Sequence, residues 1–325
     1  MRHALLGAAL LVCSAGVRLQ SSQDLAAKGV ADTWHELKDG PHKLAWFHAP
    51  GTATSFGATL MHYASPTLPR SVGAEDLRGW DPFFRFYPPA QWFKDGLWVE
   101  KCDHAPVTDE VYQEYKGHFA GLFRKPMERI ASKWRPNFWL PIDAYARRTN
   151  GTVALELAGE AFGEEYTEFP GRKYCRGLRN ASEGEAPPPN LDLAVQRLRE
   201  GFMFVGLMEE FDLSVCLFHA MFGGECLPVE FENMRKGGPR SSYPELADLY
   251  NVDQVLYDIA AERFWRDVKA FGVHREFCRK LCANVGHIFE RTEDDAGGNS
   301  TVNAYAERIE YDWPGRWVLD EGEEQ

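Results

Sequence analysis

The sequence predicts an α/β protein, in which short buried strands alternate with helices. Apolar runs of strand-like composition recur along the chain, at residues 44–48, 96–100, 117–123 and 202–208. Most of these runs lead into a segment with helical spacing, an order of elements that is typical of α/β domains. Hydrophobic residues make up 44% of the 325 residues, and aromatic residues 13%, which is enough for a sizeable core.

The N-terminal residues 1–17 have the pattern of a signal peptide or a short signal anchor. Arg2 precedes an apolar run from Ala4 to Cys13, and small residues follow that run. The run is short for a membrane span, which needs roughly 20 residues. A cleaved signal peptide is therefore favoured, with an anchor as the alternative. Residues 18–42 are polar and are interpreted as a lead-in to the folded domain.

The cysteine content predicts an oxidising compartment. An even number of cysteines follows Cys13, and in a secretory chain this predicts disulfides whose pairing the sequence leaves open. These cysteines are Cys102, Cys175, Cys216, Cys226, Cys278 and Cys282. Glycosylation sequons begin at Asn150, Asn180 and Asn299. We therefore expect the chain to be in the secretory pathway or outside the cell.

Charge and motif content argue against several function classes. The formal net charge of −12 argues against general nucleic-acid binding. A Walker phosphate loop needs Gly-Lys-Ser or Gly-Lys-Thr, which the chain lacks. His274, Cys278 and Cys282 are spaced for one helix face and could ligate zinc. Buried or disulfide-bonded cysteines are the favoured interpretation, so no metal site is predicted.

The first candidate site lies within residues 44–63. A predicted strand runs into a loop of small residues, Ala49 to Thr54, and then into a segment with helical spacing that Thr54 or Ser55 can cap. A loop of this kind at a helix N-terminus can hold an anion, because free backbone N–H groups and the helix dipole point at the ligand. Many such turns bind nothing, so the pattern needs support from elsewhere in the chain.

Further candidate residues follow the next predicted strands. His104 comes after the run 96–100, where α/β enzymes place their chemistry, although a solvent-exposed loop histidine is the alternative. Arg124 follows the run 117–123, and Ser132 lies in the helix predicted to begin near Pro126. A guanidinium and a hydroxyl so placed can hold one phosphate. A surface Arg–Glu pair is the alternative interpretation.

The remaining segments supply helices and loops. Helical spacing is present at residues 209–219 and 253–271, and residues 291–325 form an acidic C-terminal tail. Residues 65–95 and 135–190 are predicted to be rich in loops. A basic glycine loop contains Arg235 and Lys236, which could add a phosphate contact.

Three stretches, in chain order, resemble motifs of lumenal carbohydrate sulfotransferases, which move sulfate from 3′-phosphoadenylyl sulfate (PAPS) to sugar hydroxyls. Residues 47–56 resemble the 5′-phosphosulfate loop, H-x-P-K-x-G-T-S-F. Residues 122–132 resemble the 3′-phosphate motif, and residues 204–214 resemble F-V-G-L-x-E-x-[FW]-x-x-S. The resemblance covers residues 43–290. It implies a three-layer, P-loop-like fold with a central, mostly parallel sheet flanked by helices.

The resemblance implies a role for each candidate residue. Thr52, Thr54 and Ser55 would hold the 5′-phosphate, Arg124 and Ser132 would hold the 3′-phosphate, and His104 would be the general base. The implied PAPS-binding set is Gly51, Thr52, Ala53, Thr54, Ser55, Phe56, Arg124, Ser132, Arg235 and Lys236. The acceptor would be a glycan or another hydroxyl-bearing molecule in the Golgi lumen, chosen by the loops at 65–95 and 135–190. Only the possible N-terminal anchor would touch a membrane.

One departure from the family pattern keeps two alternatives open. The family's loop lysine falls at Gly51 in this chain, and its loop glycine falls at Ala53. Loss of that cation would raise the barrier by on the order of 3–4 kcal/mol, by analogy with a lost oxyanion-hole donor. The first alternative is a secreted pseudoenzyme that binds nucleotide or glycan without turnover. The second is a glycan-binding module built on the aromatic region between Trp80 and Trp98.

Overall fold

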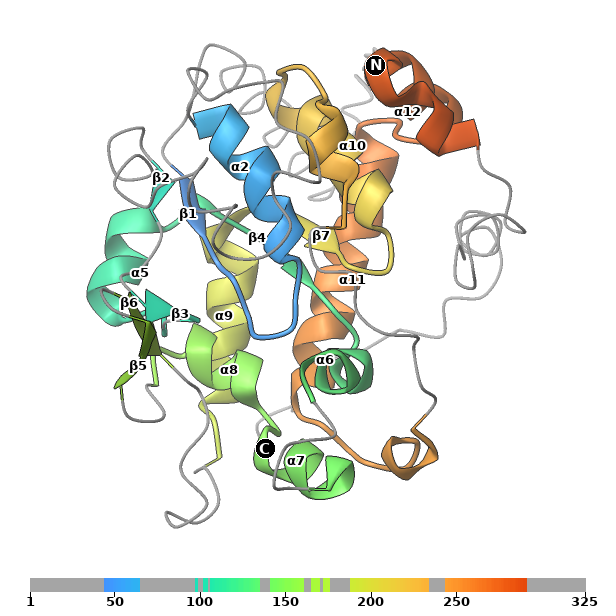
Figure 1. The fold of residues 1–325 in the computed structure, drawn as a ribbon. Coiled ribbons are helices and arrows are strands. Elements are labelled where there is room, and N and C mark those ends of the chain that lie inside the picture. The colour runs from blue at the N-terminus through green and yellow to red at the C-terminus, as the bar shows by residue number, and fades with distance from the viewer. Residues whose placement is uncertain are drawn as a thin grey trace, which may run out of the picture. The chain divides into compact units, whose positions relative to one another are not determined.

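A parallel sheet of four strands organises the part of the chain that the structure describes (Figure 1). The strands are β1 (Leu44–Trp46), β2 (Leu97–Trp98), β4 (Phe119–Phe123) and β7 (Phe202–Leu207), in the order β2-β1-β4-β7. Ala45 pairs with Phe119, and Ala120 pairs with Phe204. Every residue of β1, β4 and β7 is buried, which explains why these strands read as continuous apolar runs. The α/β prediction and its strands are confirmed.

This computed structural model describes residues 44–64, 97–98, 102–104, 106–134, 141–160, 165–169, 172–175, 188–233 and 243–290. All of them belong to the second of two units, Gly40–Gln325. The predicted signal segment 1–17, the lead-in 18–42 and the tail 291–325 lie outside the described residues.

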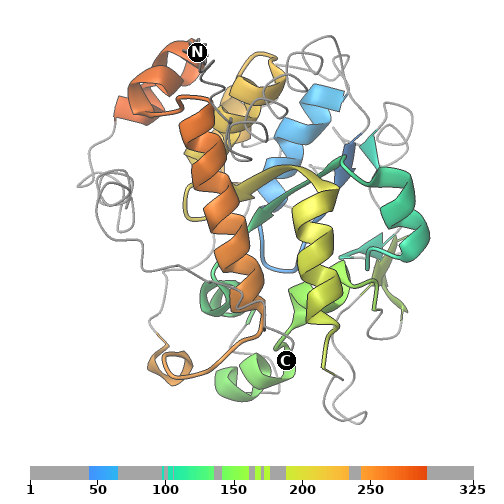
Figure 2. The same cartoon turned by 180° about the vertical axis from the view of Figure 1, so that it is seen from behind.

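Helices cover both faces of the sheet. On one face lie α2 (Gly57–Ala64) and α10 (Phe211–Phe222), and on the other lie α9 (Leu191–Gly201) and α11 (Asp253–Ala270), as Figures 1 and 2 show from opposite sides. The core between β7 and α10 is aromatic. The ring of Phe204 lies 5.4 Å from that of Phe56 and 5.2 Å from that of Phe218, measured between centroids. Burial of these rings helps to hold α10 on the sheet.

The other described elements surround the two ends of this sheet. They are α5 (Asp109–Tyr115), α6 (Pro126–Lys133), α7 (Ile142–Arg148), α8 (Thr152–Leu157), α12 (Arg275–Leu281) and the 3-10 helices η1 (Thr54–Phe56), η3 (Pro228–Phe231), η4 (Pro244–Leu246) and η5 (Ala283–Glu290). A second sheet has the order β3-β6-β5, from β3 (Cys102–Asp103), β6 (Arg172–Cys175) and β5 (Glu165–Phe169).

The region 135–190 is more structured than we expected from its sequence. It contains α7, α8, β5 and β6 rather than loops alone. The helix α7 is short and packs its apolar residues Ile142 and Tyr145 against Ile130 of α6. Helices of two turns have little periodic signal of their own, because tertiary packing stabilises them rather than helix propensity.

A buried ion pair joins three of the helices. Arg129 of α6 donates to Asp253 at the start of α11, with an Nη2–Oδ2 distance of 3.1 Å and with 3% and 2% of the two side chains exposed. The Asp253 carboxylate also accepts from the backbone N–H groups of Val153 (3.2 Å) and Ala154 (2.9 Å) at the start of α8. A pair this deeply buried contributes little net energy, but the loss of one partner leaves an uncompensated charge.

Disulfides fasten α12 to the rest of the domain. Within the described residues, Cys216 is bonded to Cys278 and Cys226 to Cys282. This confirms the prediction of disulfides and indicates an oxidising, secretory-type environment. The two cysteines of the zinc alternative are therefore not thiolates, and His274 instead caps α12, its Nδ1 accepting from the N–H of Phe277 (3.3 Å). No helix among the described residues is long and apolar enough to span a bilayer.

We predict that Asp253→Asn lowers the free energy of unfolding by about 3–5 kcal/mol, because it leaves the Arg129 guanidinium buried without its counter-ion. The measurement is the urea midpoint at neutral pH. Asp143→Asn is the matched control, since its partner Arg147 lies at the surface and the pair is solvent-exposed. Equal midpoints for the two variants would contradict the prediction.

Candidate functional site

Three segments far apart in the sequence meet at the carboxyl ends of β1 and β4. Arg124, directly after β4, donates from Nη1 to the carbonyl oxygen of Gly51 in the loop after β1 (3.2 Å). His104, directly after β3, donates from Nδ1 to the carbonyl oxygen of His48 (2.7 Å). The structure thus brings Arg124 and His104 each into contact with the segment after β1.

The topology of the main sheet explains why the loop after β1 and Arg124 converge, whereas His104 follows β3 of the second sheet. β1 lies between β2 and β4, and all three strands run parallel, so their carboxyl ends share one edge. The chain leaves β1 toward α2 on one face, whereas it enters β7 from α9 on the opposite face (Figures 1 and 2). A reversal of this kind opens a crevice outside the strand ends, where α/β proteins bind ligands.

Gly51 is required by the path of the loop. Its φ of +76° lies in the left-handed region that favours glycine. A Cβ atom at this position would lie 2.9 Å from the carbonyl oxygen of Arg129 and 3.5 Å from the Cβ of Lys133, both on α6. Figure 1 shows the loop after β1 passing beside α6. The loop therefore packs so tightly on α6 that a side chain at position 51 does not fit.

Some of the predicted phosphate ligands face inward. The Thr52 hydroxyl and the Thr52 N–H both donate to the carbonyl oxygen of Ala49, at 2.5 and 3.2 Å. The Phe56 N–H donates to Ala53 (3.0 Å), and the Phe56 ring is wholly buried in the core. In this conformation these donors hold the loop together and are not offered to a ligand. Ala53 itself is 8% exposed and precedes η1.

The remaining hydroxyls of the loop lie at the start of η1. Thr54 is half-buried, and its Oγ1 lies 3.3 Å from Nε2 of His48. Ser55 is 9% exposed on the next position of η1. Ser132 is half-buried on the last turn of α6, beside the residue that faces Gly51. Arg235 and Lys236 lie outside the described residues.

A stack of rings holds His104. The His48 ring stacks on Trp46, with centroids 4.5 Å apart, and the His104 ring lies tilted against the His48 ring, with centroids 4.7 Å apart. A carbonyl oxygen can only accept, so neutral His104 carries its proton on Nδ1 and has its basic lone pair on Nε2. His104 also has a φ of +64°, a conformation that is costly for a residue with a Cβ and that recurs at functional sites.

Carboxylates surround Arg124. The nearer one, Glu128, lies one helical turn away, with an Nη2–Oε2 distance of 3.8 Å. The second, Glu209, follows β7 and accepts from the Lys125 N–H (2.9 Å) and the Tyr257 hydroxyl (3.3 Å). Burial raises the pKa of Glu209 more than the Lys125 N–H lowers it.

Sequence reasoning did not assign roles to Glu209 or Lys133. The sequence nevertheless contained a reason to consider each of them. Glu209 follows a buried strand that ends at the same sheet edge, and Lys133 directly follows Ser132. Only the packing of the loop on α6 shows that Lys133 faces Gly51.

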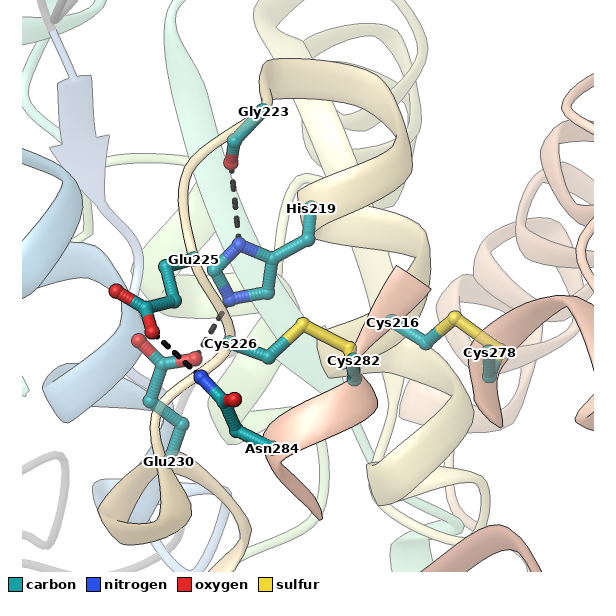
Figure 3. Close-up of a disulfide and its surroundings, with 9 residues drawn as sticks. All are labelled: Cys216, His219, Gly223, Glu225, Cys226, Glu230, Cys278, Cys282 and Asn284. Carbon is teal, nitrogen blue, oxygen red and sulfur yellow. Dashed lines mark hydrogen bonds and ion pairs between the residues drawn. A yellow bond between two sulfur atoms is a disulfide. The ribbon is translucent and has the colours of Figure 1, made fainter. Parts of the chain in front are cut away.

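A buried pair of side chains, His219 and Glu230, lies behind the elements that pack on the loop after β1. Nε2 of His219 lies 2.6 Å from Oε2 of Glu230, and Nδ1 lies 3.1 Å from the carbonyl oxygen of Gly223 (Figure 3). Glu230 belongs to η3, which packs against η1 and α2. Burial lowers the pKa of His219, but the Glu230 carboxylate and the Gly223 carbonyl outweigh it, so the pKa is raised overall. With acceptors at both ring nitrogens, the protonated form of His219 is favoured.

Comparison of the chain with models of known protein families, with curated proteins and with solved structures finds no match. What this chain does is therefore inferred from its own residues and from the three motifs.

We predict that His219 makes the stability of the domain depend on pH. A histidine whose pKa is raised on folding stabilises fully below its unfolded value of about 6.5 and loses that contribution as the pH rises through the folded value. The free energy of unfolding should therefore fall on the alkaline side of pH 6.5, by at most about 1.4 kcal/mol per pH unit. Urea midpoints across that range measure it. His219→Gln is the control, and the same slope in that variant would contradict the assignment.

Proposed function

We propose that this protein is a PAPS-dependent sulfotransferase that moves a sulfuryl group to a hydroxyl of a glycan acceptor in the Golgi. The contact between Arg124 and Gly51 carries the proposal. It joins the stretch that resembles the 3′-phosphate motif to the stretch that resembles the 5′-phosphosulfate loop. A nucleotide with phosphates at both positions is the ligand that such a pairing suits. The parallel sheet with helices on both faces is compatible with the three-layer, P-loop-like fold that the resemblance implies.

His104 is the base in this proposal. The His48 carbonyl holds the proton on Nδ1, so Nε2 takes the proton of the acceptor hydroxyl. The acceptor oxygen then forms a bond to sulfur, the bond from sulfur to the phosphate oxygen breaks, and 3′,5′-adenosine bisphosphate leaves. The fixed tautomer and the ring stack keep the base at the edge where Arg124 would hold the nucleotide.

Lys133 compensates for the lysine that the loop lacks. Its Cβ lies 3.5 Å from the place where a Cβ of residue 51 would be. A lysine from α6 therefore starts at almost the same point as a lysine from the loop. Its flexible stem brings the ammonium to the leaving phosphate oxygen, where positive charge stabilises the breaking bond.

The pseudoenzyme is the second candidate, and one observation favours it. The donors of Thr52 are turned toward Ala49, so the loop presents fewer groups to a 5′-phosphate than the family motif implies. A chain that binds the nucleotide through Arg124 alone would hold it without aligning the sulfate for transfer. Binding and transfer therefore have to be measured separately.

We predict that Arg124→Ala abolishes the thermal shift produced by 3′,5′-adenosine bisphosphate, because it removes the forked donor of the 3′-phosphate. His104→Ala should retain the shift and lose transfer of labelled sulfate from PAPS to a glycan panel by about 10²–10⁴-fold. Arg147→Ala is the control, since the Arg147 side chain is 58% exposed and pairs with Asp143 on the same helix, α7.

The other possible results of the binding and transfer assays each point to a different conclusion. Binding without transfer in the parent protein would support the pseudoenzyme, and the absence of binding would contradict both readings. Glycan binding that survives Arg124→Ala would support a glycan-binding module.

We predict that Lys133→Met lowers the rate of transfer by about 10²–10³-fold, the size of effect expected for one charge-stabilising group. The nucleotide shift should change much less, because methionine keeps the apolar stem. Gly51→Lys should not rescue this variant, since the left-handed φ and the contact with Arg129 exclude a side chain there. Lys116→Met, at the exposed end of α5, is the control. Full activity of Lys133→Met would contradict the assignment.

A further inference from the structure

We propose that Cys102 and Cys175 form a disulfide that joins β3 to β6. These are the two cysteines after Cys13 that remain once the Cys216–Cys278 and Cys226–Cys282 bonds are assigned. An even set of cysteines in an oxidising compartment tends to pair completely. Among the cysteines after Cys13, elimination therefore leaves Cys102 and Cys175 as partners for each other.

The strand register places the two positions close together. β3 and β6 are parallel neighbours, with Cys102 opposite Lys173 and Asp103 opposite Tyr174. Residues alternate between faces along a strand, so positions 173 and 175 belong to the same face as position 102. Cys102 and Cys175 are thus diagonal neighbours on one face of a two-strand ladder.

The distance between such positions is close to what a disulfide spans. Diagonal neighbours in a sheet lie roughly 7–8 Å apart, measured between Cα atoms, whereas a disulfide bridges up to about 6.8 Å. The difference of about an ångström has to be closed where the strands end. β3 ends at Asp103 and β6 ends at Cys175, so the β3–β6 ladder does not continue past these residues, while the other edge of Cys175 pairs with Glu165 of β5.

The chemistry requires no new kind of reagent. Two thiols lose two protons and two electrons, and a disulfide-bearing oxidant is reduced to its dithiol by exchange. An oxidant of this class is already needed for the Cys216–Cys278 and Cys226–Cys282 bonds. The proposed bond therefore forms under the conditions in which the protein matures.

The bond would act on the candidate base. Cys102 lies two residues before His104, whose backbone turns with a φ of +64° to reach the His48 carbonyl. β3 belongs to the second sheet, whereas His48 follows β1 of the main sheet. A covalent link from β3 to β6 holds the strand end from which His104 turns, so we assign the pair a positioning role.

The test is a peptide map of the secreted, unreduced protein after alkylation in denaturant. Trypsin cleaves after Lys101 and Lys116 and after Lys173 and Arg176, so the two cysteines fall in peptides 102–116 and 174–176. We expect these peptides to be joined, to separate on reduction and to carry no alkyl label. An alkyl label on either peptide, or a link from either to Cys13 or to a second copy of the chain, would overturn the proposal.

Serine variants provide matched controls. Cys102→Ser and Cys175→Ser should each expose one new reactive thiol, and the double variant should expose none. Cys13→Ser should leave the joined peptides unchanged. The map of the unaltered protein decides the pairing even where a variant fails to fold.

The positioning role rests on the proposed function and needs a separate readout. In the double serine variant, the thermal shift produced by the nucleotide should persist, because Arg124 and Gly51 follow strands of the main sheet rather than β3 or β6. Transfer should fall several-fold relative to the parent. Unchanged transfer with the joined peptides confirmed would remove the positioning role and leave the disulfide in place.

Discussion

The buried pair of Arg129 and Asp253 is the interaction on which the candidate site depends. It fixes α6 between α8 and the start of α11, and α6 is the surface against which the loop after β1 packs. Arg124 precedes this helix, and Ser132 and Lys133 end it. Two charges with few exposed atoms tolerate little displacement, because separation in a low-dielectric interior is costly. The positions of Ser132 and Lys133, which we propose as ligands, therefore depend on this ion pair.

The absence of the family's lysine at position 51 has a different interpretation once the backbone conformation of Gly51 is known. In the sequence alone, a glycine in place of the family's lysine is a lost catalytic cation. In the structure, the same glycine allows a left-handed turn that brings the loop within contact distance of the Arg129 carbonyl. The loop and the helix are closer together than a lysine at position 51 would permit. Close packing then places the helix's own lysine at the loop.

The sequence was sufficient to predict those strands and disulfides whose signal lies in a short run of residues or in the cysteine count. Continuous apolar runs identified β1, β4 and β7, and an even cysteine count identified the disulfides. Strand ends identified Arg124 and His104 as candidate residues, and both contact the segment after β1. The inward hydrogen bonds of Thr52 could not be predicted, because they depend on the exact turn at Ala49. The helices within 135–190 were missed because packing stabilises them rather than their own periodicity, with α7 packing on α6 and α8 on α9 and α11.

The loop after β1 is among the first described segments to be synthesised, yet part of its support comes from much later residues. η3 lies against η1, and η3 follows Cys226, whose disulfide partner is Cys282 near the end of α12. The ribosome releases Cys282 only when most of the chain has emerged. The loop after β1 therefore lacks this part of its support until Cys282 has been synthesised. During that interval the loop after β1, which we propose binds phosphate, does not have its final shape.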